Sequence, residues 1–208
     1  EITNGELSGY TVSVSVLAFQ KSHVKLIVCD LETQDPYDAS SHVSYVINST
    51  PYLKHVHMMA TSVSIGHNLS KFFRTISLNS PSIRVTGISA ADIGAPTGNS
   101  TDNVFVFSDK IMHVGAIFIL LIGENLEVRS SMNLGWIPVG KDHIVTEVKN
   151  ELTVSKIDDE PAADFYRKYL GISISQNLVK NSVEFPVIVK RNSNNYIARN
   201  IMAAFPDG

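Results

Sequence analysis

Residues 135–171 read GWIPVGKDHIVTEVKNELTVSKIDDEPAADFYRKYLG, and this run carries the clearest secondary-structure signals in the chain. Within it, residues 144–157 predict a β-hairpin, because apolar and polar residues alternate on both sides of a short polar turn. We place the turn at Lys149 and Asn150, since asparagine tolerates the positive φ that tight hairpins require.

A helix is predicted directly after the hairpin, over residues 158–171. Asp158 or Asp159 can cap its start, Pro161 stands in its first turn, and Gly171 ends it. Its apolar residues recur at helical spacing and form one stripe: Ala162, Phe165, Tyr166, Tyr169 and Leu170. We expect this aromatic stripe to pack against a sheet.

The rest of the chain alternates strand and helix signals. Residues 67–78 predict a helix, residues 32–41 predict a loop around Pro36, and residues 183–208 predict two strands joined at Asn192 to Asn195. Further strands are predicted at residues 10–19, 23–31, 55–64, 83–89, 104–108 and 114–123. The fold class is therefore α/β (mixed α+β), with mixed, largely antiparallel sheets, helices packed on them, and two halves.

Composition excludes several classes of function. Seventeen basic against twenty acidic residues give a net charge of −3, so neither nucleic acid nor an anionic membrane is an expected partner. The single cysteine, Cys29, lies in an apolar run and is expected to be buried, which favours a reducing, cytoplasmic environment. The apolar run at residues 114–123 is too short to span a bilayer and predicts a buried strand.

Motifs for catalysis or cofactor binding are not evident. The glycines lack the spacing of phosphate-binding loops, and the chain has no Gly-x-Ser-x-Gly elbow. His55 and His57 fall on one face of a predicted strand, but no third metal ligand accompanies them. We therefore expect no enzyme, no metal and no cofactor.

Residues 135–171 resemble the FIST (F-box and intracellular signal transduction) family of sensory domains. That family has a Gly-Trp-x-Pro-[Val/Ile]-Gly segment, a Val-Thr hairpin, an Asp-Gly-x-Pro-Ala turn and a Tyr-x-x-Tyr-Leu-Gly helix. The matching residues are Gly135, Trp136, Pro138, Val139, Gly140, Thr146, Asp158, Pro161, Ala162, Tyr166, Tyr169, Leu170 and Gly171. Asp159 stands where the family has glycine.

The resemblance implies a domain organisation and a class of function. Residues 1–141 correspond to a FIST-N domain that lacks its start, and residues 142–208 to a FIST-C domain that lacks its end. Members of the family act in intracellular signal transduction beside chemotaxis, kinase or cyclic-nucleotide output domains, and a eukaryotic member is an F-box protein. The chain is thus expected to bind a small ligand, of which an amino acid is a candidate. The alternative is a scaffold that binds a signalling or ubiquitin-ligase protein without a small ligand.

The candidate ligand site centres on GISAAD, residues 87–92, which resembles a Gly-Gly-x-Ala-Gly-Asp loop of the family. Gly87 would allow close backbone approach, while Ile88 and Ala91 replace two small positions of the loop. Polar groups for an amino-acid ligand would come from Asp92 for the amine, Arg199 for the carboxylate, and Ser89 and Thr97 for neutral hydrogen bonds. The alternatives are a turn role for Asp92 and a surface ion pair for Arg199.

Trp136 is the only tryptophan and stands between Gly135 and Gly140, two residues before Pro138. The ring is expected either to fill the seam between the two halves as a buried wedge or to line a ligand cleft there. We favour the wedge, since burial is the commoner fate of a large aromatic ring.

Overall fold

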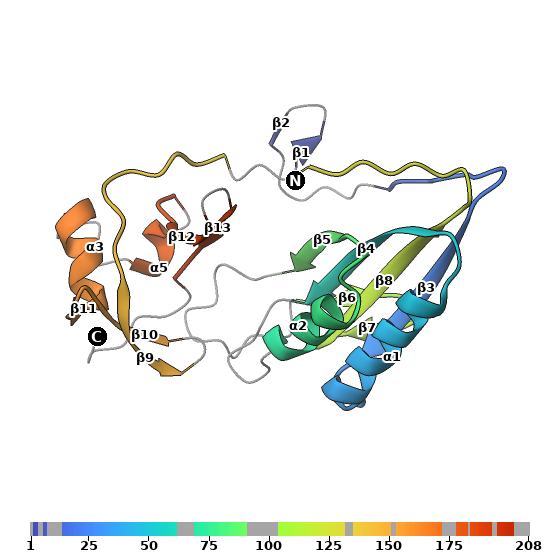
Figure 1. Cartoon of the computed structure of the whole chain (residues 1–208), viewed down its shortest axis with the longest axis horizontal. Helices are drawn as coiled ribbons and strands as arrows, with labels where there is room; N and C mark the ends of the chain where they lie inside the picture. The colour runs from blue at the N-terminus through green and yellow to red at the C-terminus, as the bar shows by residue number, and fades with distance from the viewer. Residues whose placement is uncertain are drawn as a thin grey trace. The chain divides into compact units, whose positions relative to one another are not determined.

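The computed structural model describes residues 2–3, 6–7, 14–61, 69–90, 104–131, 135–150, 153–171, 178–182, 184–192 and 195–201. The chain divides into two compact units, Glu1–Ser130 and Ser131–Gly208. Helices and mostly antiparallel strands occur in both units, so the expected mixed α+β class is confirmed (Figure 1). The domain boundary expected after residue 141 stays a prediction.

A four-stranded sheet forms the centre of the first unit. Its strands are β3 (His23–Asp30), β4 (Leu53–Thr61), β5 (Val85–Ala90) and β8 (Gly115–Ile122), in the order β3-β8-β4-β5. β8 is antiparallel to both of its neighbours, and β4 is parallel to β5. These strands confirm the expectations for the corresponding runs. A short pair, β1 (Ile2–Thr3) and β2 (Glu6–Leu7), precedes them.

Two helices, α1 (Pro36–Ser49) and α2 (Ser70–Asn79), pack side by side on one face of this sheet (Figure 1). α2 confirms the helix expected at residues 67–78. The core between helices and sheet includes Cys29, Val43, Val56, Phe72, Ile76, Phe118 and Leu120. Burial on this scale is the main source of stability of the unit. Cys29 is buried as expected, and burial raises the pKa of its thiol to about 11.

The loop expected at residues 32–41 is present at residues 32–35, but α1 overturns it from Pro36 onward. Asp35 caps the helix, since its carboxylate accepts the backbone N–H groups of Tyr37 at 2.8 Å and Asp38 at 3.0 Å. Pro36 occupies the first helical turn, where the N–H that it lacks would have no partner within the helix. The proline that indicated a loop therefore starts a helix.

The opposite face of the sheet, here called the open face, carries a small hairpin. Its strands are β6 (Val106–Phe107) and β7 (Ile111–Met112). Val106 and Met112 are buried against Ile117 of β8. At the hairpin turn, Lys110 forms an ion pair with Asp30 at the end of β3. The hairpin is thus fixed to the sheet by one apolar cluster and one charged contact.

The strand expected at residues 10–19 is not present in its described part. Residues 14–19 have no strand structure, and Val14 and Val16 are 82% and 85% exposed. Residues 10–13 lie outside the described residues. An alternating pattern forms a strand only where a neighbouring strand supplies hydrogen bonds and a core receives the apolar side chains.

The second unit contains the hairpin expected at residues 144–157. Its strands are β9 (Val145–Asn150) and β10 (Thr153–Ile157), and β11 (Glu160–Pro161) pairs with β10. The turn does not lie at Lys149 and Asn150 as expected. Both residues belong to β9, and the two residues that follow them lie outside the described residues.

The helix expected after the hairpin is α3 (Ala162–Leu170), and Gly171 ends it with a φ of 81° as expected. The expected aspartate cap is wrong, because Pro161 is the residue before the helix and makes no side-chain cap hydrogen bond. Asp158 and Asp159 form the turn between β10 and β11 and have positive φ values of 52° and 65°. Asp and Asn tolerate this left-handed conformation better than most residues.

α3 contacts β10 and β11, and Tyr166 of its apolar stripe is buried. β12 (Val187–Asn192) and β13 (Asn195–Arg199) confirm the two strands expected near the end of the chain, and α5 (Leu178–Asn181) precedes them. Among the described residues, no helix is long and apolar enough to cross a membrane.

Candidate functional site

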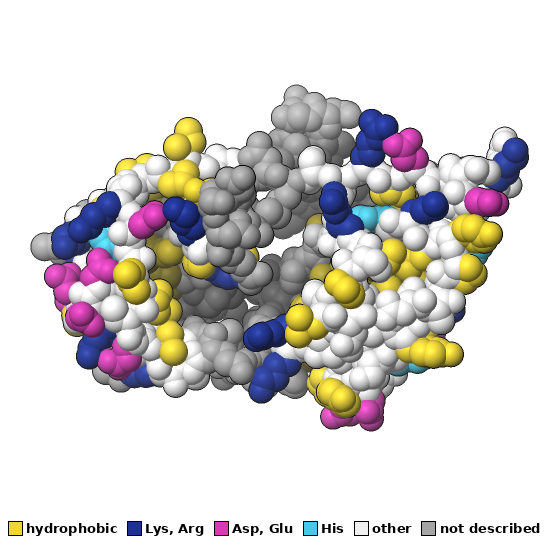
Figure 2. Space-filling model, viewed as in Figure 1, with side chains coloured by type: hydrophobic (Ala, Val, Ile, Leu, Met, Phe, Trp, Pro, Cys, Tyr) yellow, Lys and Arg dark blue, Asp and Glu magenta, His cyan; other side chains and the backbone are white. Residues whose placement is uncertain are grey.

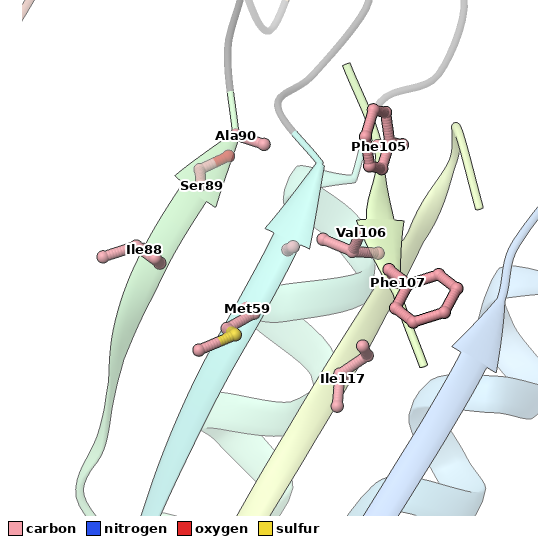
Figure 3. A pocket seen from close by; sticks show the side chains of 9 residues that line it. Met59, Ile88, Ser89, Ala90, Phe105, Val106, Phe107 and Ile117 are labelled. Carbon is pink, nitrogen blue, oxygen red and sulfur yellow. The ribbon is translucent and has the colours of Figure 1, made fainter. Parts of the chain in front are cut away.

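A pocket of about 250 Å³ lies on the open face of the four-stranded sheet (Figure 3). We call it the sheet pocket. It is lined by the following residues from β4, β5, β6, β8 and the segment that enters β6: Met59, Ala60, Ile88, Ser89, Ala90, Phe105, Val106, Phe107 and Ile117. Eight of these nine residues are apolar, so the pocket is mainly a hydrophobic one.

Strand register produces the floor of the sheet pocket. Met59 of β4 lies opposite Ile88 of β5 on one side and opposite Ile117 of β8 on the other. Residues paired across neighbouring strands project to the same face of a sheet. These three side chains therefore form one apolar row that crosses three strands, and Figure 3 shows them on the open face.

One wall of the sheet pocket comes from the β6–β7 hairpin. Val106 is buried beneath the hairpin, whereas Phe105 and Phe107 on either side of it are exposed and border the pocket. Alternation along the strand separates the anchoring residue from the two bordering ones. In the view of Figure 2, other hydrophobic side chains of this unit are scattered between polar ones, which is ordinary for a protein surface.

The hairpin that forms this wall is held by the ion pair between Lys110 and Asp30. Asp30 is buried and its carboxylate also accepts the backbone N–H of Glu32 at 3.1 Å. The hydrogen bond from Lys110 is the main reason that the pKa of Asp30 lies below its ordinary value of 3.8, and the Glu32 N–H adds to the effect. Asp30 therefore remains an anion that holds the hairpin turn through Lys110.

Of the six expected ligand residues, Ser89 lines the sheet pocket at the end of β5. Gly87 is two residues earlier on the same strand, but its backbone approaches another strand and not the pocket. A Cβ at this position would lie 2.0 Å from the carbonyl oxygen of Met58 in β4. Asp92 and Thr97 lie outside the described residues.

Trp136 and Arg199 both belong to the second unit. The Trp136 ring is 46% exposed and donates a hydrogen bond from Nε1 to the Glu184 carbonyl at 3.2 Å, so both residues of this contact belong to the second unit. Arg199 is exposed at the end of β13, and its Nη1 donates to the carbonyl of its neighbour Ala198 at 3.2 Å. A ligand role for either residue stays a prediction.

Sequence reasoning missed the apolar lining of the sheet pocket. Met59 and Ile117 lie in runs that were interpreted only as buried strands, and Ile88 was interpreted as a departure from a small-residue loop. The sequence signal that could have found part of this lining is the spacing of two between Phe105 and Phe107, which places both side chains on one side of a strand.

The two histidines expected on one strand face are in β4. His55 is buried, and a 2.8 Å hydrogen bond joins its Nε2 to Oγ1 of Thr86 in β5. Burial is the main reason that the pKa of His55 is lowered, and the positive charges of His57 and Arg84 add to it. Among the described residues, no group of three or more His, Cys, Asp or Glu side chains could hold a metal ion.

A second polar cluster, here called the His143 cluster, lies in the second unit. His143 Nδ1 is 2.6 Å from Oδ2 of Asp158, and His143 Nε2 is hydrogen-bonded to the hydroxyl of Tyr169. The ring of Phe165 packs edge-on against the imidazole at 4.9 Å. The N–H of Ile144 donates to Asp158 Oδ1 at 2.9 Å and is the main cause of the lowered pKa of that carboxyl. The His143 cluster thus connects the β10–β11 turn to α3.

Comparison with known proteins gives one match. The family model described as FIST N domain matches residues 1–160. The matched region includes the four-stranded sheet, the sheet pocket and both strands of the β9–β10 hairpin. No curated protein and no solved structure matches the chain.

Proposed function

The chain belongs to the FIST family of sensory and signal-transduction domains, and we propose that it senses a small ligand and relays binding to an attached output domain. The observation that supports a ligand most directly is the sheet pocket. It lies within the region that matches the family and combines a row of strand residues with a wall from a separate hairpin. Concave, mainly apolar sites with few polar groups are typical of small-molecule binding.

The β6–β7 hairpin, which forms one wall of the sheet pocket, is the element that would relay ligand binding. β6 and β7 have two residues each, so few backbone hydrogen bonds hold the hairpin in place. Val106 and Met112 are buried against Ile117, so the binding free energy of a ligand would have to supply the cost of any shift of the hairpin. A ligand that contacts Phe105 and Phe107 would favour one position of the hairpin and act on Asp30 through Lys110.

An amino acid is the ligand class that the family resemblance implies. Under this proposal Asp92 binds the amine, with Ser89 and Thr97 as hydrogen-bonding residues, while a role of Arg199 in binding a carboxylate stays a prediction. Because the family is a sensory one, we propose no catalytic activity and no cofactor. The cytoplasm is the proposed place of action, in keeping with a single cysteine, Cys29, that is buried.

A thermal-shift screen followed by calorimetry tests ligand binding. The panel should contain the amino acids and a set of neutral aromatic and aliphatic compounds. A saturable rise in melting temperature supports a sensor, because a ligand that binds only the native state stabilises it. For an amino-acid hit, Asp92→Ala or Arg199→Ala should abolish the rise. A panel that leaves the melting temperature unchanged at millimolar concentrations would argue against the proposal.

A protein-binding scaffold is the second candidate function. It is favoured by the exposure of Phe107 and Ile111, two large apolar side chains paired across the β6–β7 hairpin. Exposed apolar groups of this kind occur at protein interfaces. Binding of a purified signalling or ubiquitin-ligase protein that is lost in Ile111→Asp, in a domain that binds no small molecule, would favour this function.

A further inference from the structure

The lining of the sheet pocket contains no ionisable side chain among the described residues. Its single polar residue is Ser89, which pairs with Ala60 of β4, so its side chain lies on the other side of β5 from Ile88. The nearby cation of the hairpin, Lys110, is engaged by Asp30. Among the described residues, a ligand that enters the sheet pocket therefore meets apolar carbon and two phenyl rings.

The size of the sheet pocket limits what it can hold. Its volume is about 250 Å³. That value lies between the roughly 150 Å³ of an apolar cavity that binds benzene and the roughly 300 Å³ at the lower end of drug-sized sites. The pocket therefore fits a compact molecule of one ring, or of two fused rings, and not an extended chain.

Charge decides which molecules of this size bind well. A zwitterionic amino acid would bring an ammonium and a carboxylate to a lining whose described residues offer neither of them an opposite charge, so these residues would not compensate their desolvation. Ile88 and Phe107 at the rim are 62% and 63% exposed, so part of any bound molecule stays in contact with water. The free-energy cost of desolvating the charged groups of an amino acid is thus reduced but not removed.

We propose that the sheet pocket binds a neutral, mainly apolar ring compound, and that it discriminates against the amino acid with the same ring. This inference rests on the proposed sensory function and specifies the ligand class of its site. The ring lies on the row formed by Met59, Ile88 and Ile117. Phe107 covers one side of it.

Two matched pairs of compounds test the discrimination: 2-phenylethanol against phenylalanine, and indole against tryptophan. Within each pair the ring is the same, and the amino acid adds the two charged groups. Titration of the full chain labelled at Met and Ile methyl groups reports binding at the floor of the pocket. We expect the Met59 and Ile117 methyl resonances to shift, and the neutral member of each pair to bind at least about tenfold more tightly.

Substitutions at exposed positions keep the test independent of folding. Phe107→Ala removes one wall, and Ser89→Ala removes the hydroxyl group. The matched control is Leu26→Ala, since Leu26 is 56% exposed on β3, and its partner Ile119 lies two residues along β8 from Ile117. We expect Phe107→Ala to weaken binding of 2-phenylethanol at least about fivefold, with Ser89→Ala and Leu26→Ala unchanged. Methyl spectra of each variant confirm that it is folded.

Two results would overturn the inference and leave the sensor proposal intact. One is phenylalanine binding as tightly as 2-phenylethanol. The other is an amino acid that binds with dependence on Asp92 or Arg199 and shifts no methyl resonance of the pocket. If neither the neutral compounds nor the amino acids bind, the inference and the proposed sensory function fail together.

Discussion

At the scale of single residues, Gly87 has a packing role that its sequence context did not reveal. Its backbone lies so close to β4 that a methyl group would overlap the Met58 carbonyl at 2.0 Å. Backbone cannot rotate away as a flexible side chain can, so a side chain here must separate β5 from β4. The glycine thus stabilises the sheet that forms the floor of the pocket.

Gly87→Ala should therefore destabilise the protein by about 1–3 kcal/mol, the usual cost of forcing extra atoms into a packed site. Chemical denaturation of the full chain measures the change. Ser89→Ala on the same strand is the control, since it removes an exposed hydroxyl without adding atoms, and it should change stability by less than about 0.5 kcal/mol. Equal stability of Gly87→Ala and the parent protein would contradict the close approach.

Asp30 provides a pH-dependent test of the hairpin attachment. Its folded pKa is lowered from 3.8, mainly by the hydrogen bond from Lys110. A carboxyl group with a lowered folded pKa contributes stability that is fully present above its unfolded pKa and is lost as the pH falls through the folded value. The parent protein should therefore lose stability from about pH 4 downward more steeply than Asp30→Asn. Parallel curves for the two proteins from pH 6 to pH 2 would contradict this role of Asp30.

Tyr169 tests the His143 cluster. Its hydroxyl hydrogen-bonds to His143, whose other nitrogen contacts Asp158. Tyr169→Phe removes one hydrogen bond from the cluster and keeps the ring that packs on Phe165, so we expect a loss of about 1 kcal/mol. Tyr45→Phe, at a mostly exposed ring of α1, is the matched control and should be close to neutral. A neutral Tyr169→Phe would mean that the hydroxyl group contributes nothing to stability.

At the scale of helices and strands, periodicity predicted the elements that form the core. It failed where strand formation depends on a neighbouring strand. α2 and β8 were predictable because their apolar residues face the buried side at the helical period or form one continuous buried run. Residues 14–19 alternate as a strand would, yet they have no strand structure. Local pattern records which face a strand would bury, but not whether a neighbour is present.

α1 was missed for a different reason. Proline in a polar segment was interpreted as a sign of a loop. Proline is also favoured in the first turn of a helix, and Pro36 lies there. The candidate site was less predictable than the fold. Ser89 was identified, but the row of Met59, Ile88 and Ile117 depends on the register of three strands that are distant in sequence.

The cap of α1 gives the prediction at this scale. Asp35→Ala leaves the first N–H groups of the helix without their side-chain acceptor and should cost about 1 kcal/mol. Asp38→Ala removes an acidic residue from the same first turn but leaves the cap in place, so its effect should be smaller. The two variants are compared by thermal unfolding followed by circular dichroism. A larger effect of Asp38→Ala would contradict the capping role of Asp35.

At the scale of the whole molecule, the two units differ in the size of their described cores. The first unit contains both of the hydrophobic clusters found among the described residues. Tyr166 is the buried apolar residue described in the second unit, and burial raises the pKa of its hydroxyl to about 12. Since stability scales with apolar burial, the first unit should be the more stable of the two.

The chain contains a natural probe in each unit, because it has one tryptophan and one cysteine. Trp136 fluorescence reports on the second unit, where its indole N–H binds the Glu184 carbonyl. Cys29 is 2% exposed in β3, and its raised pKa keeps the thiol unreactive until the first unit opens. We expect the fluorescence transition at lower denaturant concentration than the reaction of Cys29 with a thiol reagent. Coincident transitions would instead show that both units unfold as one cooperative body, because agreement between independent probes is the test of two-state unfolding.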